Sequence, residues 1–116
     1  MLEKINVGID IVEINRFQLL PYAKNKKFYE NIFKKSEIVY CTKFKNPYPH
    51  FAGRFAIKEA LIKSIEIKIK MKDIEIFQKK SKPMIKTLEE IPYIFRISLS
   101  HDGKYTIAIV ISEKQK

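Results

Sequence analysis

Polar residues in three separate segments of this 116-residue chain are of types that could do chemistry. Asp10 lies two residues after a glycine. Glu59 and Lys63 lie four residues apart, and His101 lies between a serine and an aspartate. Two carboxylates, several cations and a histidine are the groups that a magnesium pyrophosphate site needs, because Mg²⁺ takes one or two carboxylates together with phosphate oxygens and waters. Lys and Arg side chains would neutralise the remaining phosphate charge.

Each of these fragments also has a simpler interpretation. Asp10 could cap the N-terminus of a following helix. Glu59 and Lys63 could form an exposed pair one helical turn apart, which contributes only a few tenths of a kcal/mol. His101 could be a partly exposed turn residue beside Asp102. A Ser-His-Asp hydrolase triad is not expected at residues 98–102, because consecutive residues at one strand end do not converge on a nucleophile.

The charge balance favours an anionic partner. The chain has 23 Lys and Arg against 13 Asp and Glu, a formal net charge of +10 and a pI of about 9.7. Nucleic acid, an anionic membrane, a phosphorylated small molecule and an acidic protein all fit this charge. The three arginines, Arg16, Arg54 and Arg96, are more informative than the many lysines, because guanidinium binds phosphate and carboxylate in bidentate geometry.

Length and composition predict a single domain over residues 1–116. Hydrophobic residues make up 46% of the chain, with six Tyr and eight Phe, which excludes a disordered segment. Its apolar runs are far shorter than the ~20 residues of a membrane-spanning helix, and residues 1–4 run into a strand pattern unlike a signal peptide. The lone Cys41 is expected to be a small buried hydrophobe, which fits a reducing, cytoplasmic compartment.

The N-terminal third is predicted to contain a strand and short helices. Residues 5–11 alternate in hydropathy, which indicates a half-buried strand with Ile5, Val7, Ile9 and Ile11 on one face. Asp10 is expected to end this strand and to begin a helix that Pro21 stops. Residues 24–35 have apolar side chains at helical spacing, and Ser36 with Glu37 is typical of the start of another short helix.

The rest of the chain is predicted to be one long helix and a series of strands. Residues 50–65 form the longest helical candidate, after a Pro-containing break at 46–49. Strand patterns follow at 73–78, 83–87, 94–100 and 105–111, and Asp102-Gly103 indicates a hairpin between the last two. This order predicts an α+β fold with the long helix packed on a largely antiparallel sheet.

Three sequence blocks resemble those of the holo-[acyl-carrier-protein] synthase family, the small members of the phosphopantetheinyl transferase superfamily. Residues 8–14, Gly-Ile-Asp-Ile-Val-Glu-Ile, resemble the family's N-terminal block. Residues 52–63 resemble its Arg-Phe-x-x-Lys-Glu-Ala block, and residues 98–102, Ser-Leu-Ser-His-Asp, resemble its third. The order and spacing of the blocks also match, and the resemblance covers essentially the whole chain.

The resemblance implies a 4′-phosphopantetheinyl transferase-like fold and an enzyme of fatty acid biosynthesis. Such an enzyme transfers the 4′-phosphopantetheine arm of coenzyme A (CoA) to a serine of apo acyl carrier protein and releases adenosine 3′,5′-bisphosphate. Carried over by motif, Asp10 and Glu59 would be magnesium ligands, and Lys63 would contact the phosphates and stabilise the leaving group. The catalytic base stays open between Glu59, Asp10 and a water.

The same resemblance implies binding residues and an oligomer. Arg54 and His101 would hold the nucleotide end of CoA, Pro83 would line the adenine pocket, and Arg16 would meet the acidic carrier protein. A homotrimer with the CoA site at the protomer interface is expected, and neither nucleic acid nor a membrane is expected as a partner. The chain departs from the family in residues 64–72, which lack glycine, and in Ser81, which replaces a glycine of the family's turn.

Two other functions compete with this hypothesis. A small basic RNA-binding module would fit an α+β fold of high pI, but the sequence lacks a Gly-flanked aromatic strand and a Gly-x-x-Gly clamp. A family member without activity would form an oligomer that does not turn over CoA. A Glu59→Gln change distinguishes them, because it removes a charged metal ligand without creating a cavity.

Overall fold

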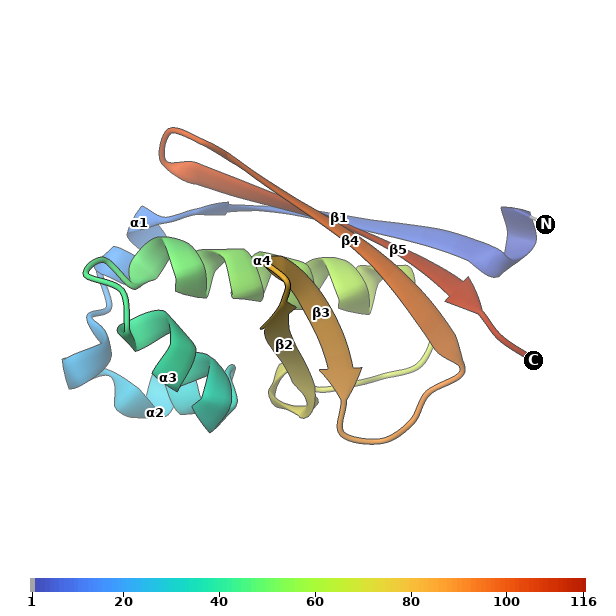
Figure 1. Cartoon of the computed structure of the whole chain (residues 1–116), viewed down its shortest axis with the longest axis horizontal. Coiled ribbons are helices and arrows are strands. Elements are labelled where there is room, and N and C mark those ends of the chain that lie inside the picture. Colours follow the sequence, from blue (N-terminus) through green and yellow to red (C-terminus); the bar gives the residue numbers. More distant parts are fainter. Residues whose placement is uncertain (1) are drawn as a thin grey trace.

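The computed structural model describes residues 2–116; the predictions that include residue 1 extend beyond the described residues. Its strands are β1 (Ile5–Glu13), β2 (Ile74–Lys79), β3 (Lys82–Thr87), β4 (Tyr93–Asp102) and β5 (Tyr105–Lys114). Its helices are α1 (Asn15–Gln18), α2 (Lys26–Glu30), α3 (Lys35–Thr42) and α4 (Tyr48–Ser64), with short 3-10 turns η1 (Leu2–Lys4), η2 (Tyr22–Lys24) and η3 (Met71–Asp73). Within the described chain, an antiparallel sheet in the order β1-β5-β4 lies over α4, while α2, α3 and the β2-β3 hairpin lie on the opposite side of α4 (Figure 1). The predicted α+β fold is confirmed.

Helix α4 is the centre of the core. Its sequence has prolines only in the first turn, where a missing backbone N–H costs no hydrogen bond. Most residues from Phe51 to Ser64 are buried, since the sheet covers one side of α4 and the α2-α3 segment the other. The helix is therefore buried on most sides, with Arg54 and Lys58 among its buried residues. The predicted helix over residues 50–65 is therefore confirmed within two residues at its start and one at its end.

The C-terminal strands also agree with the sequence pattern. Strands β4 and β5 form the predicted hairpin, and Gly103 adopts a positive φ of 58° in its turn, a conformation that favours glycine. Strands β2 and β3 form a second hairpin. Cys41 is fully buried as predicted, and burial raises the pKa of its thiol to about 12.

The prediction that Asp10 ends the first strand is wrong. Strand β1 continues to Glu13 because residues 5–13 all pair with β5, and Asp10 lies opposite Ala108 in the middle of that ladder. The helix expected from Val12 to Leu20 is reduced to the four residues of α1, and its N-cap residue is Ile14, not Asp10. The capping interpretation of Asp10 is therefore excluded.

The apolar face of β1 is not the face that packs against α4. Ile5, Val7, Ile9 and Ile11 are 38–59% exposed, whereas Gly8 and Val12 face α4. A Cβ atom on Gly8 would lie 1.7 Å from the backbone oxygen of Ala60, so only glycine permits this approach of strand to helix. The alternation predicted a strand correctly, but close packing at Gly8 decides which face is inside.

The segment before α4 differs in two further details. The single helix expected over residues 24–35 is reduced to α2, which follows η2, and the chain then turns before α3. Ser36 lies inside α3 and does not cap it; the Glu37 carboxylate instead accepts a hydrogen bond from the Lys34 backbone N–H at 2.8 Å. Between α4 and η3, isoleucines alternate with charged residues over residues 65–70, but these residues form bends and irregular backbone and not a strand.

Candidate functional site

Lys63 and Asp10 join α4 to β1. The Lys63 ammonium donates hydrogen bonds to the backbone oxygen of Ile9 at 3.0 Å and to Asp10 Oδ1 at 3.2 Å. The Asp10 side chain is only 15% exposed, on the strand face that packs against α4, while Lys63 is half exposed. The close approach at Gly8, two residues earlier, allows a strand carboxylate to meet a helix ammonium here.

Glu59 lies one turn before Lys63 on α4 and is half-buried. Within residues 2–116 it makes no hydrogen bond and no ion pair, so the exposed Glu59–Lys63 pair of the simpler interpretation does not form. Lys63 pairs with Asp10 instead. Glu59 is thus an unpaired carboxylate one helical turn from a lysine that already binds another carboxylate.

Asp10 and Glu59 suit a divalent cation that prefers oxygen ligands. Asp10 already binds a positive charge, the Lys63 ammonium, and Glu59 has no competing partner within the described chain. No cluster of three or more His, Cys, Asp or Glu residues suited to a metal occurs among residues 2–116. Two carboxylates are enough for Mg²⁺, which completes its coordination with waters and phosphate oxygens.

A pocket of about 530 Å³ lies beside the N-terminal half of α4. It brings together three of the predicted binding residues, Arg54, Pro83 and His101, from α4, β3 and β4. Of the described residues, no Asp or Glu lines it, whereas one arginine and two histidines do. The pocket can therefore attract an anion.

Arg54 is the most informative residue of the pocket. It is only 5% exposed, and its guanidinium carbon lies 4.1 Å above the Tyr40 ring centre. Its Nε is buried without a hydrogen-bond partner in the described chain. An unpaired buried donor of this kind costs about 1–3 kcal/mol, and an anionic ligand in the pocket would satisfy it.

The sequence analysis assigned no role to other residues that line this pocket. His50, from the first turn of α4, stacks its ring on Phe44 at 3.7 Å, and Tyr40 carries the Arg54 guanidinium. Burial and the positive charges of Arg54 and His101 lower the pKa of His50. The sequence spacing could have indicated that His50 lines the pocket, since it precedes Arg54 by four residues and thus lies on the same helix face.

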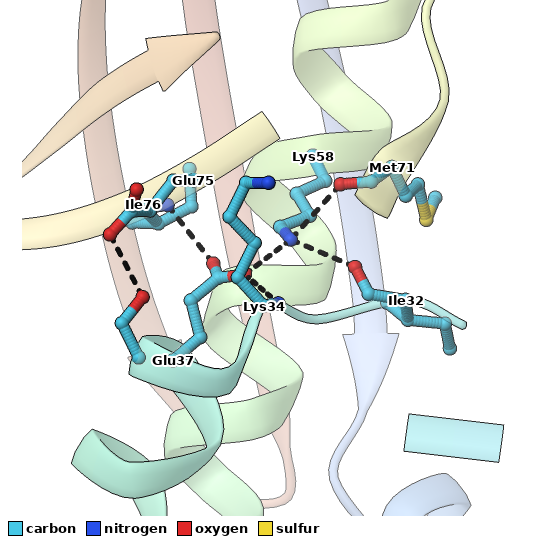
Figure 2. A network of polar contacts seen from close by, with 8 residues as sticks. Ile32, Lys34, Glu37, Lys58, Met71, Glu75 and Ile76 are labelled. Atoms are coloured by element: carbon cyan, nitrogen blue, oxygen red, sulfur yellow. Dashed lines mark hydrogen bonds and ion pairs between the residues drawn. The ribbon is translucent and has the colours of Figure 1, made fainter. Parts of the chain in front are cut away.

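Lys58 and Glu37 form a buried network beside the pocket (Figure 2). Lys58 Nζ donates to Glu37 Oε1 at 2.6 Å and to the backbone oxygens of Ile32 and Met71 at 2.8 and 3.1 Å. Glu37 Oε2 accepts from the Ile76 N–H at 3.0 Å. The network ties α4 to α3 and β2, which carry Tyr40 and Ile76 on the pocket's walls. The sequence motif includes Lys58, but nothing in it indicated burial.

The predicted site residues form two separate sets in one chain. Asp10, Glu59 and Lys63 do not line the Arg54 pocket. Lys63 follows Arg54 by nine residues, which is about 13 Å along the helix axis. Arg16 belongs to neither set: it is exposed on α1, with its guanidinium carbon 4.8 Å above the Phe55 ring centre.

Comparisons with known proteins identify the family. Residues 6–110 match the family model described as the 4′-phosphopantetheinyl transferase superfamily. The chain belongs to this superfamily. Within the superfamily it is similar to proteins named holo-[acyl-carrier-protein] synthase: one from Chlamydia caviae is 33% identical over 96% of this chain and 98% of the relative, and one from Thermodesulfovibrio yellowstonii is 36% identical over 90% and 95%.

Solved structures of the superfamily agree in fold. A holo-(acyl-carrier-protein) synthase from Bacillus anthracis in complex with CoA (3′,5′-ADP) superposes with a TM-score of 0.80 and 31% identity, over 95% of this chain and 96% of that one. A holo-[acyl-carrier-protein] synthase from Helicobacter pylori in complex with coenzyme A gives a TM-score of 0.76 and 32% identity, over 92% and 99%. The phosphopantetheinyl transferase-like fold that the sequence motifs implied is confirmed. No helix within residues 2–116 is long and apolar enough to cross a membrane.

Proposed function

We propose that this chain transfers the 4′-phosphopantetheine group of CoA to a serine of apo acyl carrier protein. The products are holo acyl carrier protein and adenosine 3′,5′-bisphosphate, and the reaction serves fatty acid biosynthesis. The observation that carries the proposal is the buried, unpaired Arg54 Nε beside a pocket without carboxylates among its described residues, in a chain of this superfamily. Relatives named holo-[acyl-carrier-protein] synthase, one of them solved with CoA, support it.

The reaction breaks the phosphoanhydride bond of the CoA pyrophosphate and forms a phosphoester bond to the carrier serine. The carrier serine oxygen attacks the phosphorus that bears the pantetheine, the bond to the bridging oxygen of the pyrophosphate breaks, and the nucleotide leaves as the bisphosphate. Glu59 is the proposed base for the serine proton, because it is the carboxylate of the site without a partner among residues 2–116. Lys63 neutralises the charge that develops on the leaving group, since its ammonium is half exposed and already held in place by Asp10. Asp10 and a water remain the alternatives for the base.

Magnesium is part of this proposal, with Asp10 and Glu59 as its ligands. When bound there, Mg²⁺ would make the phosphorus more electrophilic and stabilise the leaving phosphate. The donor set supports it, as two carboxylates near one ammonium have an affinity for cations and leave coordination positions for phosphate oxygens. The chain's own residues orient the substrate and move the proton.

A homotrimer is also part of the proposal. The outer face of the sheet carries apolar side chains along two neighbouring strands, Ile5, Val7, Ile9 and Ile11 on β1 with Ile107, Ile109 and Ile111 on β5. An exposed apolar patch of this kind is typical of a protein interface. Assembly would also complete the site, because one chain keeps the Arg54 pocket apart from Asp10, Glu59 and Lys63. We propose that the two sets meet across the interface between protomers.

The remaining elements of the proposal concern the carrier protein and the cell. The net charge of +10 would speed the encounter with an acidic carrier protein, and exposed Arg16 on α1 is the proposed contact. We infer a single domain, since the buried apolar residues of the described chain form one core cluster around α4. A cytoplasmic location follows from the substrates of the proposed reaction.

Intact mass spectrometry tests the activity. Apo acyl carrier protein is incubated with this protein, CoA and Mg²⁺, with EDTA in a parallel sample. A gain of ~340 Da, the mass of one phosphopantetheine arm, is expected only in the sample with metal. No gain would contradict the proposed transfer, and a gain that persists in EDTA would contradict the role of Mg²⁺.

A further inference from the structure

His50 is held in the Arg54 pocket by contacts that leave its ring nitrogens free. Its ring lies 3.7 Å from the Phe44 ring at an interplanar angle of 15°, and it meets the Tyr40 ring edge-on at 6.1 Å. Neither ring nitrogen makes a hydrogen bond to another residue of 2–116. The stacking therefore fixes the plane of the imidazole, while its polar edge remains available to a ligand.

Basic side chains surround His50. Arg54 lies one turn further along α4, His101 comes from β4, and Lys43 approaches the Tyr40 ring from the end of α3 at 5.3 Å. Tyr40 is the remaining titratable group that faces the ring, and among the described residues no carboxylate lines the pocket. Burial, and then the charges of Arg54 and His101, lower the pKa of His50 and so favour its neutral form.

We propose that His50 is a third phosphate-binding group of this pocket, and that it takes up a proton when the phosphate monoester of CoA binds. This inference rests on the proposed function, which places CoA in the pocket with Arg54 and His101. The monoester is the only phosphate of CoA that carries close to two negative charges near pH 7. It therefore attracts a third cation more strongly than the pyrophosphate does. Its charge would offset the repulsion from Arg54 and His101.

The consequence is an affinity for CoA that falls as the pH rises. A dianion beside His50 favours the imidazolium, so the pKa of His50 is higher in the complex than in the protein alone. Binding is then strengthened below the pKa of the complex and loses this contribution as the pH rises through it. Dephospho-CoA, which lacks the monoester, should gain nothing from His50.

Calorimetric titration of CoA and of dephospho-CoA at pH 6.5 and pH 8.5 tests this in the wild type and in His50→Phe. Phenylalanine keeps the stack on Phe44 but has no titratable nitrogen. We expect His50→Phe to bind CoA about three- to ten-fold more weakly at pH 6.5 and within about two-fold at pH 8.5. Its affinity for dephospho-CoA should stay within about two-fold of the wild type at both values.

Repeating the titrations in two buffers of different ionisation enthalpy measures the proton uptake on binding. A change in packing alone would not alter this uptake. At pH 6.5 the wild type should take up a measurable fraction of a proton on binding CoA, and His50→Phe should take up less. Equal proton uptake and equal pH dependence in both proteins would overturn the role of His50. Failure of the wild type to bind CoA at all would instead contradict the proposed function.

Discussion

Lys58 Nζ lies 2.6 Å from Glu37 Oε1, and both side chains are fully buried. The next residue of α4, Glu59, is the proposed base and has no partner within residues 2–116. One charge of this Lys-Glu dipeptide is therefore used inside the protein, where it holds α3 and β2 against α4, while its neighbour stays available to a substrate. A helix can do both because adjacent residues point about 100° apart.

Removing the Lys58 charge should destabilise the fold strongly. Lys58→Met leaves Glu37 buried without its cation, and breaking a buried pair in this way costs about 3–5 kcal/mol of the free energy of unfolding. Urea denaturation measures the loss. Lys35→Met, which removes an exposed lysine of α3, is the control and should change stability by less than about 0.5 kcal/mol. An equally small change in Lys58→Met would show that Glu37 finds another partner.

Glu59→Gln should separate activity from stability. It keeps the shape of the side chain but removes the proposed base and metal ligand, so the rate of carrier modification should fall at least about 100-fold. The free energy of unfolding should change by less than about 0.5 kcal/mol, since Glu59 makes no bond to another described residue. Glu90→Gln, at an exposed position, should keep full activity. Full activity in Glu59→Gln would exclude both roles of Glu59.

Gly8→Ala should disrupt the contact between β1 and α4. The new Cβ would lie 1.7 Å from the Ala60 backbone oxygen, so the strand must move away from the helix and carry Asp10 with it. The free energy of unfolding should fall by several kcal/mol, and the folded fraction of the variant should have lower activity. Gly53→Ala is the matched control: its Cβ meets only the end of the Leu99 side chain, at 3.2 Å, and alanine favours the helix. Thermal denaturation of both variants checks the difference, and a Gly8→Ala melting temperature equal to that of Gly53→Ala would contradict it.

A charge in the apolar outer face of the sheet should dissociate the proposed trimer. Ile9 is 58% exposed in the single chain, so Ile9→Lys should leave the protomer folded but place a charge in the interface. Light scattering after size-exclusion chromatography should then report a mass near the 13.7 kDa of one chain. Leu88→Lys, at a 67% exposed position between β3 and β4, should keep the oligomer of the wild type. An unchanged mass in Ile9→Lys would place the interface elsewhere.

Local sequence patterns predicted the elements whose structure depends on neighbouring residues. Helix α4 followed from helical spacing and a proline-containing start, and the β4-β5 hairpin from Asp102-Gly103 between alternating runs. The first helix was misplaced because a capping aspartate and a strand aspartate look alike until the partner strand is known. Pairing of Asp10 with Ala108, almost a hundred residues later, decides between them.

The candidate site, like the fold, was predicted from the sequence only in part. Sequence blocks alone identified the family and the residue types at Asp10, Arg54, Glu59, Lys63 and His101. The pairing of Lys63 with Asp10, the unpaired Nε of Arg54 and the position of His50 could not be read from them. Each of these depends on atoms that the fold brings together from distant segments.

The amino-acid sequence by itself therefore determined the order of most elements, the superfamily and the chemistry that its side chains can offer. Only the tertiary structure decided which face of β1 is buried and which lysine of α4 is inside. The physical reason is that hydropathy spacing shows that two faces differ, but close packing chooses between them, as at Gly8 and Ala60. A lysine can likewise be buried only where the fold supplies a carboxylate and carbonyl oxygens for it, and Lys58 obtains them from Glu37, Ile32 and Met71.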